Sequence, residues 1–547
     1  MISISMERII SVCLILSTCL TTQCFSLKTR IRTKTGFIQG FNQTVLDREV
    51  TTFLGIPFAQ PPVGSLRFRE PIPVRRWQGT RESTSFSKAC SQPAIFATNV
   101  PADEQSEDCL YLNVWVPKGG CKRKAAMIWI YGGGLIAGDV RDYNGKFLAA
   151  YTDTIVFTLN YRTGPLGFLY LNDNEAPGNM GLLDQYLAIK WIYDNIKRFG
   201  GSRRKITLFG QSAGAASVNY HTLSSFTRPY FQKAIIMSGA ANSDYGYHSP
   251  TEALVTAHEF ANHLGCKKDT VDETIECLRL LPASALSALQ LPSNPKAPLF
   301  FRVHYPTIDK NGFITQSPKE LMNRPFPRRI STLLGVVEDE VTFFLAYYVG
   351  VLKIPINILP GIVNREEFYR LLPLVSASSN QTMDIIAREY LEPYLPNEPP
   401  LYIDVGDDIG SDIIFRCPVV EIAQTLSTVK PRNPVYMYSF EHRSARSPTP
   451  SWFGVIHGSE TSYVFGYPLV DNVHFTDVDK SVSERMMKYW ATFAKTGNPN
   501  FRDDSCGDDW NPYRKRDRKY LVIDSDCPQD GEKLLEQQCD FLEQVLD

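Results

Sequence analysis

The 547-residue sequence lacks a strong excess of either charge, internal repeats and low-complexity tracts. Its 57 lysine and arginine residues nearly balance 58 aspartate and glutamate residues, which leaves a formal net charge of −1. This balance removes the main reason to expect a nucleic acid or an anionic membrane surface as a partner. Hydrophobic residues make up 43% and charged residues 21%, a composition typical of a folded globular protein rather than a disordered or fibrous one.

Long apolar runs are also missing. The run Ile9–Leu20 is too short to cross a bilayer, which needs about 20 residues, and no later stretch approaches a length of about 18 apolar residues. Its position and the small residues Thr22 and Cys24 after it are typical of a secretory signal peptide, residues 1–24. A buried N-terminal helix is the alternative. We therefore expect a secreted protein without a membrane span.

Short runs rich in β-forming residues recur along the chain, and longer amphipathic stretches separate them. Examples are Ala126–Tyr131, Thr154–Leu159, Ile206–Phe209, Lys233–Met237, Thr332–Val337, Val435–Tyr438 and Tyr520–Ile523. Such nearly continuous apolar runs indicate strands buried on both faces, as in parallel sheets covered by helices.

Between two of these runs, apolar residues from Leu183 to Ile196 recur every three or four positions and predict a helix that ends at Gly200 and Gly201. The alternation predicts an α/β fold with a large, mostly parallel, twisted central sheet flanked by helices. We expect a single domain over residues 25–547, with a helical layer at about residues 345 to 430.

The segment Gly210–Gly214 has the pattern G-x-S-x-G and lies between a predicted strand and a helix-compatible stretch. In that context the pattern predicts a nucleophile elbow, a tight turn that holds the Ser212 hydroxyl above the sheet. An ordinary glycine-rich turn is the alternative. A serine nucleophile needs a base and an acid from elsewhere in the chain.

Donors for an oxyanion hole are expected from two places. Tyr131–Gly134 closes a predicted strand upstream of the serine, and glycine lets the backbone approach a ligand closely. We expect the N–H groups of Gly133, Gly134 and Ala213 to face the developing oxyanion.

Candidates for the acid and the base follow the serine in the chain. Three carboxylates, Glu338, Asp339 and Glu340, come at the end of a predicted strand, and His457 follows in an apolar, glycine-flanked segment. The order serine, acid, histidine is the order that α/β hydrolases use.

With these residues in view, the chain resembles the cholinesterase and type-B carboxylesterase family of α/β hydrolases from about Thr35 to Val545, closest to the cholinesterase branch. The matching segments are Phe53–Ala59, Ser106–Asn113, Trp129–Gly134, Asn179–Gln185, the Ser212 elbow, Gly454–Gly458 and Tyr489–Pro499. The resemblance implies a serine carboxylic-ester hydrolase with Ser212 as nucleophile, Glu340 as acid and His457 as base. Glu338 and Asp339 become bystanders, and no metal or organic cofactor is expected.

Departures from the family pattern bear on the substrate. Cholinesterases carry a tryptophan that binds the quaternary ammonium group, but the interval from Cys90 to Cys109 has none and presents about Asn99 at that place. Gln211 stands where cholinesterases have a glutamate. We therefore expect a preference for neutral or medium-acyl esters over acetylcholine.

The resemblance also assigns residues to the substrate pocket. Phe301 and Val303 belong to the acyl pocket, where Val303 replaces a second phenylalanine and should admit longer acyl groups. Phe343 and Tyr245 supply aromatic walls, which keeps choline esters as an alternative substrate.

Two further alternatives remain. Gly-Gln-Ser-Ala-Gly is similar to the elbow of juvenile hormone esterases, which hydrolyse a hydrophobic methyl ester. A non-enzymatic, adhesion-type relative of the fold is the other, although such relatives usually lose a triad residue. The expected partner is a small ester, and the expected assembly is a monomer or a homodimer.

The 12 cysteines fit a secreted protein. Resemblance implies the pairs Cys90–Cys109, Cys266–Cys277 and Cys417–Cys539. Proximity in a polar segment suggests Cys506–Cys527, which would leave Cys121 unpaired. Asn42 and Asn380 head Asn-x-Thr sequons and are candidate glycosylation sites.

Overall fold

The computed structural model describes most of the chain after the predicted signal peptide. The described residues are 28–94, 100–119, 123–290, 304–324, 329–344, 363–376, 378–394, 401–429, 433–502, 506, 509–525 and 527–546.

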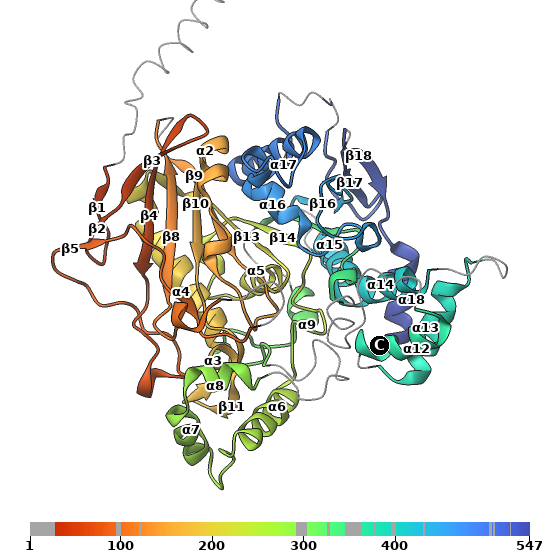
Figure 1. Cartoon of the computed structure of the whole chain (residues 1–547), viewed down its shortest axis with the longest axis horizontal. Helices are drawn as coiled ribbons and strands as arrows, with labels where there is room; N and C mark the ends of the chain where they lie inside the picture. The colour runs from red at the N-terminus through yellow and green to blue at the C-terminus, as the bar shows by residue number, and fades with distance from the viewer. Residues whose placement is uncertain are drawn as a thin grey trace, which may run out of the picture.

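An 11-stranded sheet runs through the molecule in the order β18-β17-β16-β15-β14-β13-β9-β10-β8-β4-β3 (Figure 1). Its parallel part runs from β17 to β10. These strands are β9 (Lys124–Ile130), β10 (Ile155–Leu159), β13 (Gly201–Gln211), β14 (Lys233–Met237), β15 (Ser331–Val337), β16 (Val435–Phe440) and β17 (Lys519–Ile523). Each contains one of the apolar runs identified in the sequence, so the predicted α/β fold is confirmed.

Antiparallel strands complete both edges of this sheet, and other short strands of the described chain form three smaller sheets. The edge strands are β3 (Phe41–Val45), β4 (Arg48–Pro57), β8 (Tyr111–Pro117) and β18 (Gln529–Glu532). The smaller sheets contain β1 (Arg30–Arg32), β2 (Phe37–Gln39) and β5 (Thr80–Glu82), then β6 (Ala89–Cys90) with β7 (Gln105–Ser106), and β11 (Tyr170–Asp173) with β12 (Ala176–Pro177).

The helices fall into groups along the chain. Those between β9 and β15 are α2 (Lys146–Thr152), α3 (Gly164–Phe168), α4 (Met180–Asn195), α5 (Ala213–Leu223), α6 (Pro250–His263), α7 (Val271–Leu280), α8 (Ala283–Ala288) and α9 (Pro318–Met322). α4 is the helix that the apolar periodicity predicts, and Gly200 adopts a left-handed conformation (φ 83°) after the short turn that follows it. α5 packs on β13 and β14 behind the predicted elbow.

The predicted helical layer is formed by the segment that connects β15 to β16 along the chain. It contains α12 (Arg365–Leu371), α13 (Asn380–Leu391), α14 (Tyr402–Ser411), a π-helical turn (Asp412–Arg416) and α15 (Cys417–Val429). The C-terminal helix α18 (Glu536–Leu546) lies beside it (Figure 1).

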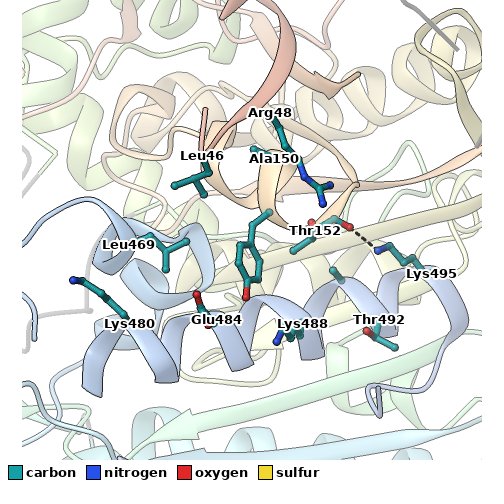
Figure 2. A pocket seen from close by; sticks show the side chains of 12 residues that line it. Leu46, Arg48, Ala150, Thr152, Leu469, Lys480, Glu484, Lys488, Thr492 and Lys495 are labelled. Atoms are coloured by element: carbon teal, nitrogen blue, oxygen red, sulfur yellow. Dashed lines mark hydrogen bonds between the residues drawn. The ribbon is translucent and has the colours of Figure 1, made fainter. Parts of the chain in front are cut away.

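Two helices follow β16. α16 (Ser459–Phe465) and α17 (Asp477–Thr496) pack together, and α17 also contacts β9, β13 and α2. A capping box of Thr476 and Asp479 begins α17, and Gly497 (φ 89°) ends it. One face of α17 lines a pocket (Figure 2). In the described part of the chain, every helix is too short or too polar to cross a bilayer.

Four disulfides join segments of the described chain. They are Cys90–Cys109, Cys266–Cys277, Cys417–Cys539 and Cys506–Cys527. These include the three pairs that the family resemblance implies and the pair suggested by proximity. Cys121 lies outside the described residues. Disulfides in this number indicate an oxidising compartment.

Candidate active site

Ser212 lies at the sharp turn where β13 ends and α5 begins. Its backbone has φ 59° and ψ −130°, a region that non-glycine residues rarely adopt and that stores local strain. A Cβ on Gly214 would lie 2.1 Å from the Ile130 carbonyl oxygen, and one on Gly210 would lie 2.6 Å from the Gly214 backbone. The two glycines of the motif are therefore needed for the close packing of this turn.

Glu340 and His457 meet near the carboxyl ends of β15 and β16. His457 Nδ1 lies 2.5 Å from Glu340 Oε2, and Glu340 is completely buried. The second carboxylate oxygen of Glu340 accepts a hydrogen bond from the Val337 N–H at 3.0 Å. An Nδ1–H that donates to the carboxylate leaves Nε2 of the imidazole free to accept a proton.

Asp339, expected to be a bystander, anchors the segment that carries His457. Its carboxylate accepts a hydrogen bond from the Val455 N–H at 2.7 Å, and its own N–H donates to the Val455 carbonyl at 3.1 Å. Gly454 (φ 59°) lies so close that a Cβ there would be 2.0 Å from Asp339 Oδ2. Gly454 is one of the glycines that flank His457 in the sequence, and it is the one sequence feature that could have indicated this contact. Glu338 is exposed.

Gln211 contacts His457, the predicted base, directly. Its Nε2 lies 3.0 Å from His457 Nε2. Because Nδ1–H is committed to Glu340, the side-chain amide of Gln211 donates this hydrogen bond. Among the described residues the Ser212 hydroxyl has no hydrogen-bond partner. In the free protein, therefore, His457 Nε2 accepts a hydrogen bond from the Gln211 amide and not from the Ser212 hydroxyl.

The glycine loop lies against the serine. A Cβ on Gly132 would be 2.8 Å from the Ser212 Cβ. Gly133 (φ 102°) and Gly134 (φ 62°) both adopt left-handed conformations, and no residue of the described chain accepts a hydrogen bond from either N–H. The N–H of Ala213 is among the first of α5, which have no acceptor within the helix. The three predicted oxyanion donors thus have no backbone partner in the described part.

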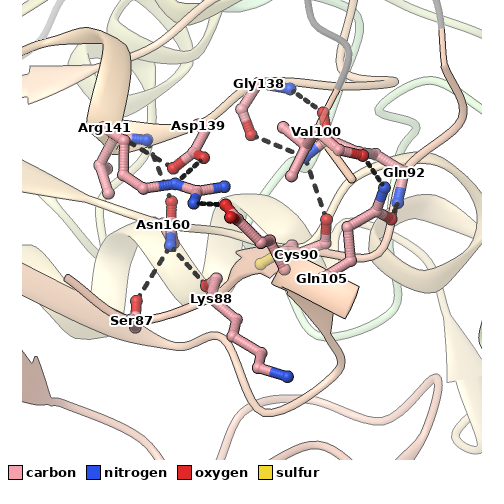
Figure 3. Close-up of polar contacts among 12 residues, drawn as sticks. Ser87, Lys88, Cys90, Gln92, Val100, Gln105, Gly138, Asp139, Arg141 and Asn160 are labelled. Atoms are coloured by element: carbon pink, nitrogen blue, oxygen red, sulfur yellow. Dashed lines mark hydrogen bonds and ion pairs between the residues drawn. The ribbon is translucent and has the colours of Figure 1, made fainter. Parts of the chain in front are cut away.

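A polar network ties this loop to the disulfide loop that contains Cys90 and Cys109 (Figure 3). The buried Gln92 side chain donates to the Gly138 carbonyl at 3.1 Å and accepts from the Gly138 N–H at 2.9 Å. The Gln92 N–H donates in turn to Gln105 Oε1 at 2.9 Å. No sequence motif marks Gln92, because its role depends on a contact between distant segments. Asn99, the expected counterpart of the tryptophan, lies outside the described residues.

Aromatic rings surround His457. Its ring centroid lies 4.3 Å from that of Phe415 and 5.4 Å from that of Phe344. The predicted pocket residue Phe343 contacts Phe344, and the ring of the buried Tyr245 lies 5.3 Å from that of Phe415. Sequence reasoning missed Phe344 and Phe415. The Phe343–Phe344 pair was a usable signal, whereas Phe415 lies in the π-helical turn and has none.

Two predicted acyl-pocket residues, Phe301 and Val303, lie outside the described residues. The predicted glycosylation sites are described. Asn42 is exposed on β3, and Asn380 is exposed at the first position of α13.

Glu460 is a buried carboxyl group that sequence reasoning also missed. Neither of its side-chain oxygens has a hydrogen-bond partner within the described chain. Burial, and then the negative charge of Glu340, raise its pKa to about 8. Glu460 is therefore mostly protonated at neutral pH and adds little negative charge beside Glu340.

The chain is similar to known proteins over most of its length. A model described as carboxylesterase family matches residues 28–542. Cholinesterase from Mus musculus is 37% identical over 533 residues, which cover 93% of this chain and 86% of the relative. Acetylcholinesterase from Bungarus fasciatus is 37% identical over 536 residues, which cover 94% of this chain and 86% of the relative.

Proposed function

We propose, from the premise that this chain belongs to the carboxylesterase family, that it is a secreted serine esterase with Ser212, Glu340 and His457 as its catalytic triad. The observation that carries the proposal is the 2.5 Å contact between His457 Nδ1 and Glu340 Oε2, beside a serine held in a strained elbow. The mature enzyme is one domain, residues 25–547, released by removal of residues 1–24.

In the proposed reaction His457 Nε2 takes the proton of Ser212 Oγ as the oxygen attacks the ester carbonyl. The negative charge that develops on the carbonyl oxygen is stabilised by the N–H groups of Gly133, Gly134 and Ala213. His457 then protonates the leaving alcohol, which leaves an acyl-enzyme. A water molecule repeats the cycle and releases the acid. Glu340 holds the imidazole tautomer and stabilises the imidazolium.

Gln211 must give up its hydrogen bond before this reaction begins, because Nε2 accepts only one donor in the plane of the ring. Substrate binding can bring about this exchange, since catalytic hydrogen bonds often form only in the Michaelis complex. After proton transfer Nε2 becomes a donor. Rotation of the Gln211 amide would then present Oε1, an acceptor, to the same atom.

The proposed substrates are neutral esters, including those with medium acyl chains. Gln211 is uncharged where cholinesterases have glutamate, so the site lacks a carboxylate that would attract an ammonium group. The missing tryptophan between Cys90 and Cys109 removes a cation–π contact of roughly 0.5–2 kcal/mol.

Choline esters are the second candidate, and one observation favours them. Phe415 and Phe344 place aromatic rings next to His457, and aromatic rings attract quaternary ammonium groups. The two relatives named above are also a cholinesterase and an acetylcholinesterase.

Matched ester pairs distinguish the two candidates. Acetylcholine and 3,3-dimethylbutyl acetate differ only in nitrogen against carbon at the charged centre, and the butyryl esters form a second pair. We expect kcat/KM for each neutral ester to equal or exceed that of its choline partner, and butyryl esters to match acetyl esters. A preference for acetylcholine of more than about tenfold over its neutral partner, or about 1.4 kcal/mol, would favour the second candidate.

A further inference from the structure

A pocket of about 690 Å³ lies away from Ser212, between α17, the end of α2 and the turn that joins β3 to β4 (Figure 2). From α17 it is lined by Lys480, Glu484, Lys488 and Lys495, which recur at intervals of about one or two helical turns and so share one face. Arg48 enters from the opposite wall (Figure 2). We call these five residues and the space between them the basic pocket.

Positive charge in the basic pocket exceeds negative charge. Glu484 is the one carboxylate among its lining residues, and it accepts a hydrogen bond from the Tyr151 hydroxyl. Lys480 pairs with Asp477 at 2.8 Å, outside the pocket. Arg48 and Lys488 form no ion pair with any described residue, so no carboxylate neutralises either charge. The Lys488 ammonium has one other contact, with the ring of Phe501, whose centre lies 5.5 Å away.

The pKa of Lys495 responds to the excess of positive charge around it. Burial lowers its pKa, and the positive charges of Lys124, Arg48 and Lys205 lower it further, against the opposing effect of Asp153. Its ammonium group donates to the Thr152 carbonyl at 2.5 Å (Figure 2). An anion in the pocket would relieve the repulsion among these cations.

The basic pocket lies near the amino ends of the parallel strands, whereas the triad lies at their carboxyl ends. Lys124 begins β9, and Gly497, at the end of α17, lies close to the start of β14 and β15. Ser212 and Glu340, by contrast, follow the carboxyl ends of β13 and β15. A ligand in the basic pocket would therefore not occupy the ester site.

We propose that the basic pocket binds an organic phosphate monoester. The dianionic group would accept charge-assisted hydrogen bonds from Arg48, Lys488 and Lys495, and Arg is suited to bind two phosphate oxygens at once. Leu46, Leu469 and Ala491 supply an apolar wall for the organic part. The volume lies in the range of small-molecule sites and exceeds what a bare ion fills.

Isothermal titration of the full-length mature protein with phenyl phosphate tests the proposal. We expect sub-millimolar binding that weakens as salt is added, since exposed charges are screened. Phenyl sulfate, which carries one charge, and inorganic phosphate, which has no apolar body, should each bind more weakly. Arg48→Met and Lys488→Met should each weaken phenyl phosphate binding about tenfold, because each removes a charge-assisted hydrogen bond.

Lys267→Met, at an exposed lysine beside Cys266, is the matched control and should bind phenyl phosphate as the unaltered protein does. Both pocket variants should retain full esterase activity, which shows that they fold. Absence of binding up to about 10 mM phenyl phosphate, which means a binding free energy weaker than about −2.7 kcal/mol, would overturn the proposal. Unchanged binding in Arg48→Met and Lys488→Met would overturn it too, and equal affinity for inorganic phosphate would overturn the assignment of an organic body.

Discussion

The triad region and the basic pocket lie at opposite ends of the strands of one sheet. They differ in how their charged side chains are buried and paired. In the triad region Glu340 is fully buried and has a specific partner at each oxygen. In the basic pocket the cations are partly exposed, and two of them lack ion-pair partners in the described chain. The difference teaches that loss of one residue should disable the triad, whereas the basic pocket should respond in small, separable steps.

The largest effect that sharpens this comparison is expected at Glu340. Glu340→Gln keeps the shape of the side chain but removes the charge that fixes the tautomer of His457. We expect kcat for a neutral ester to fall about 10⁴-fold, as in other triads whose acid becomes an amide. Steady-state kinetics measure the fall. Glu338→Gln is the matched control and should change kcat by less than about twofold, since Glu338 is exposed and does not contact His457.

A smaller loss is expected at Gln92, which acts through the glycine loop. Gln92→Ala removes both hydrogen bonds to Gly138 and lets the loop with Gly133 and Gly134 move. We expect kcat to fall about tenfold with KM nearly unchanged, less than the 10²-fold or more that follows loss of an oxyanion donor. Gln60→Ala, at a more exposed glutamine, serves as control. A higher KM at constant kcat would contradict this role.

Gln211→Glu tests whether charge beside the base sets specificity. The added carboxylate should raise kcat/KM for acetylcholine about tenfold relative to 3,3-dimethylbutyl acetate, because it attracts the ammonium group. It should also move the acidic limb of the pH–rate profile to higher pH, since a carboxylate beside His457 Nε2 favours the imidazolium. An equal change for both esters would show that residue 211 acts only through the base.

An effect on stability, with no change expected in the rate, is predicted at Glu460. Its pKa rises from 4.5 to about 8 on folding, so the folded protein holds a proton that the unfolded chain releases. This contribution to stability is complete below pH 4.5 and is lost as pH rises through 8. Glu460→Gln cannot ionise, so its free energy of unfolding in urea should fall less between pH 5 and pH 9. Parallel pH dependence in the two proteins would contradict the raised pKa.

Much of the fold could be predicted from the sequence, because strands buried on both faces leave continuous apolar runs. Most of the seven parallel strands are of this kind, and α4 left an apolar periodicity of three to four residues instead. The antiparallel edge strands β3 and β18 contain polar residues and left no such signal.

In the site, local motifs identified Ser212 and the glycine loop, and family resemblance was needed to choose Glu340 among three adjacent carboxylates. Gln92, Phe415 and Glu460 could not be found, because each acts through contacts between segments far apart in the chain. Asp339 was expected only to be a bystander of catalysis. Its contact with Val455 joins two segments that are far apart in the chain, and the nearby Gly454 was the only sequence sign of it.

The central claim is that Ser212 is the nucleophile, and covalent labelling tests it most directly. The mature protein is treated with diisopropyl fluorophosphate, and the modified peptide is identified by mass spectrometry. We expect one phosphoryl group on Ser212 with complete loss of esterase activity, and neither labelling nor activity in Ser212→Ala. A label on another residue, or full activity in Ser212→Ala, would contradict the account.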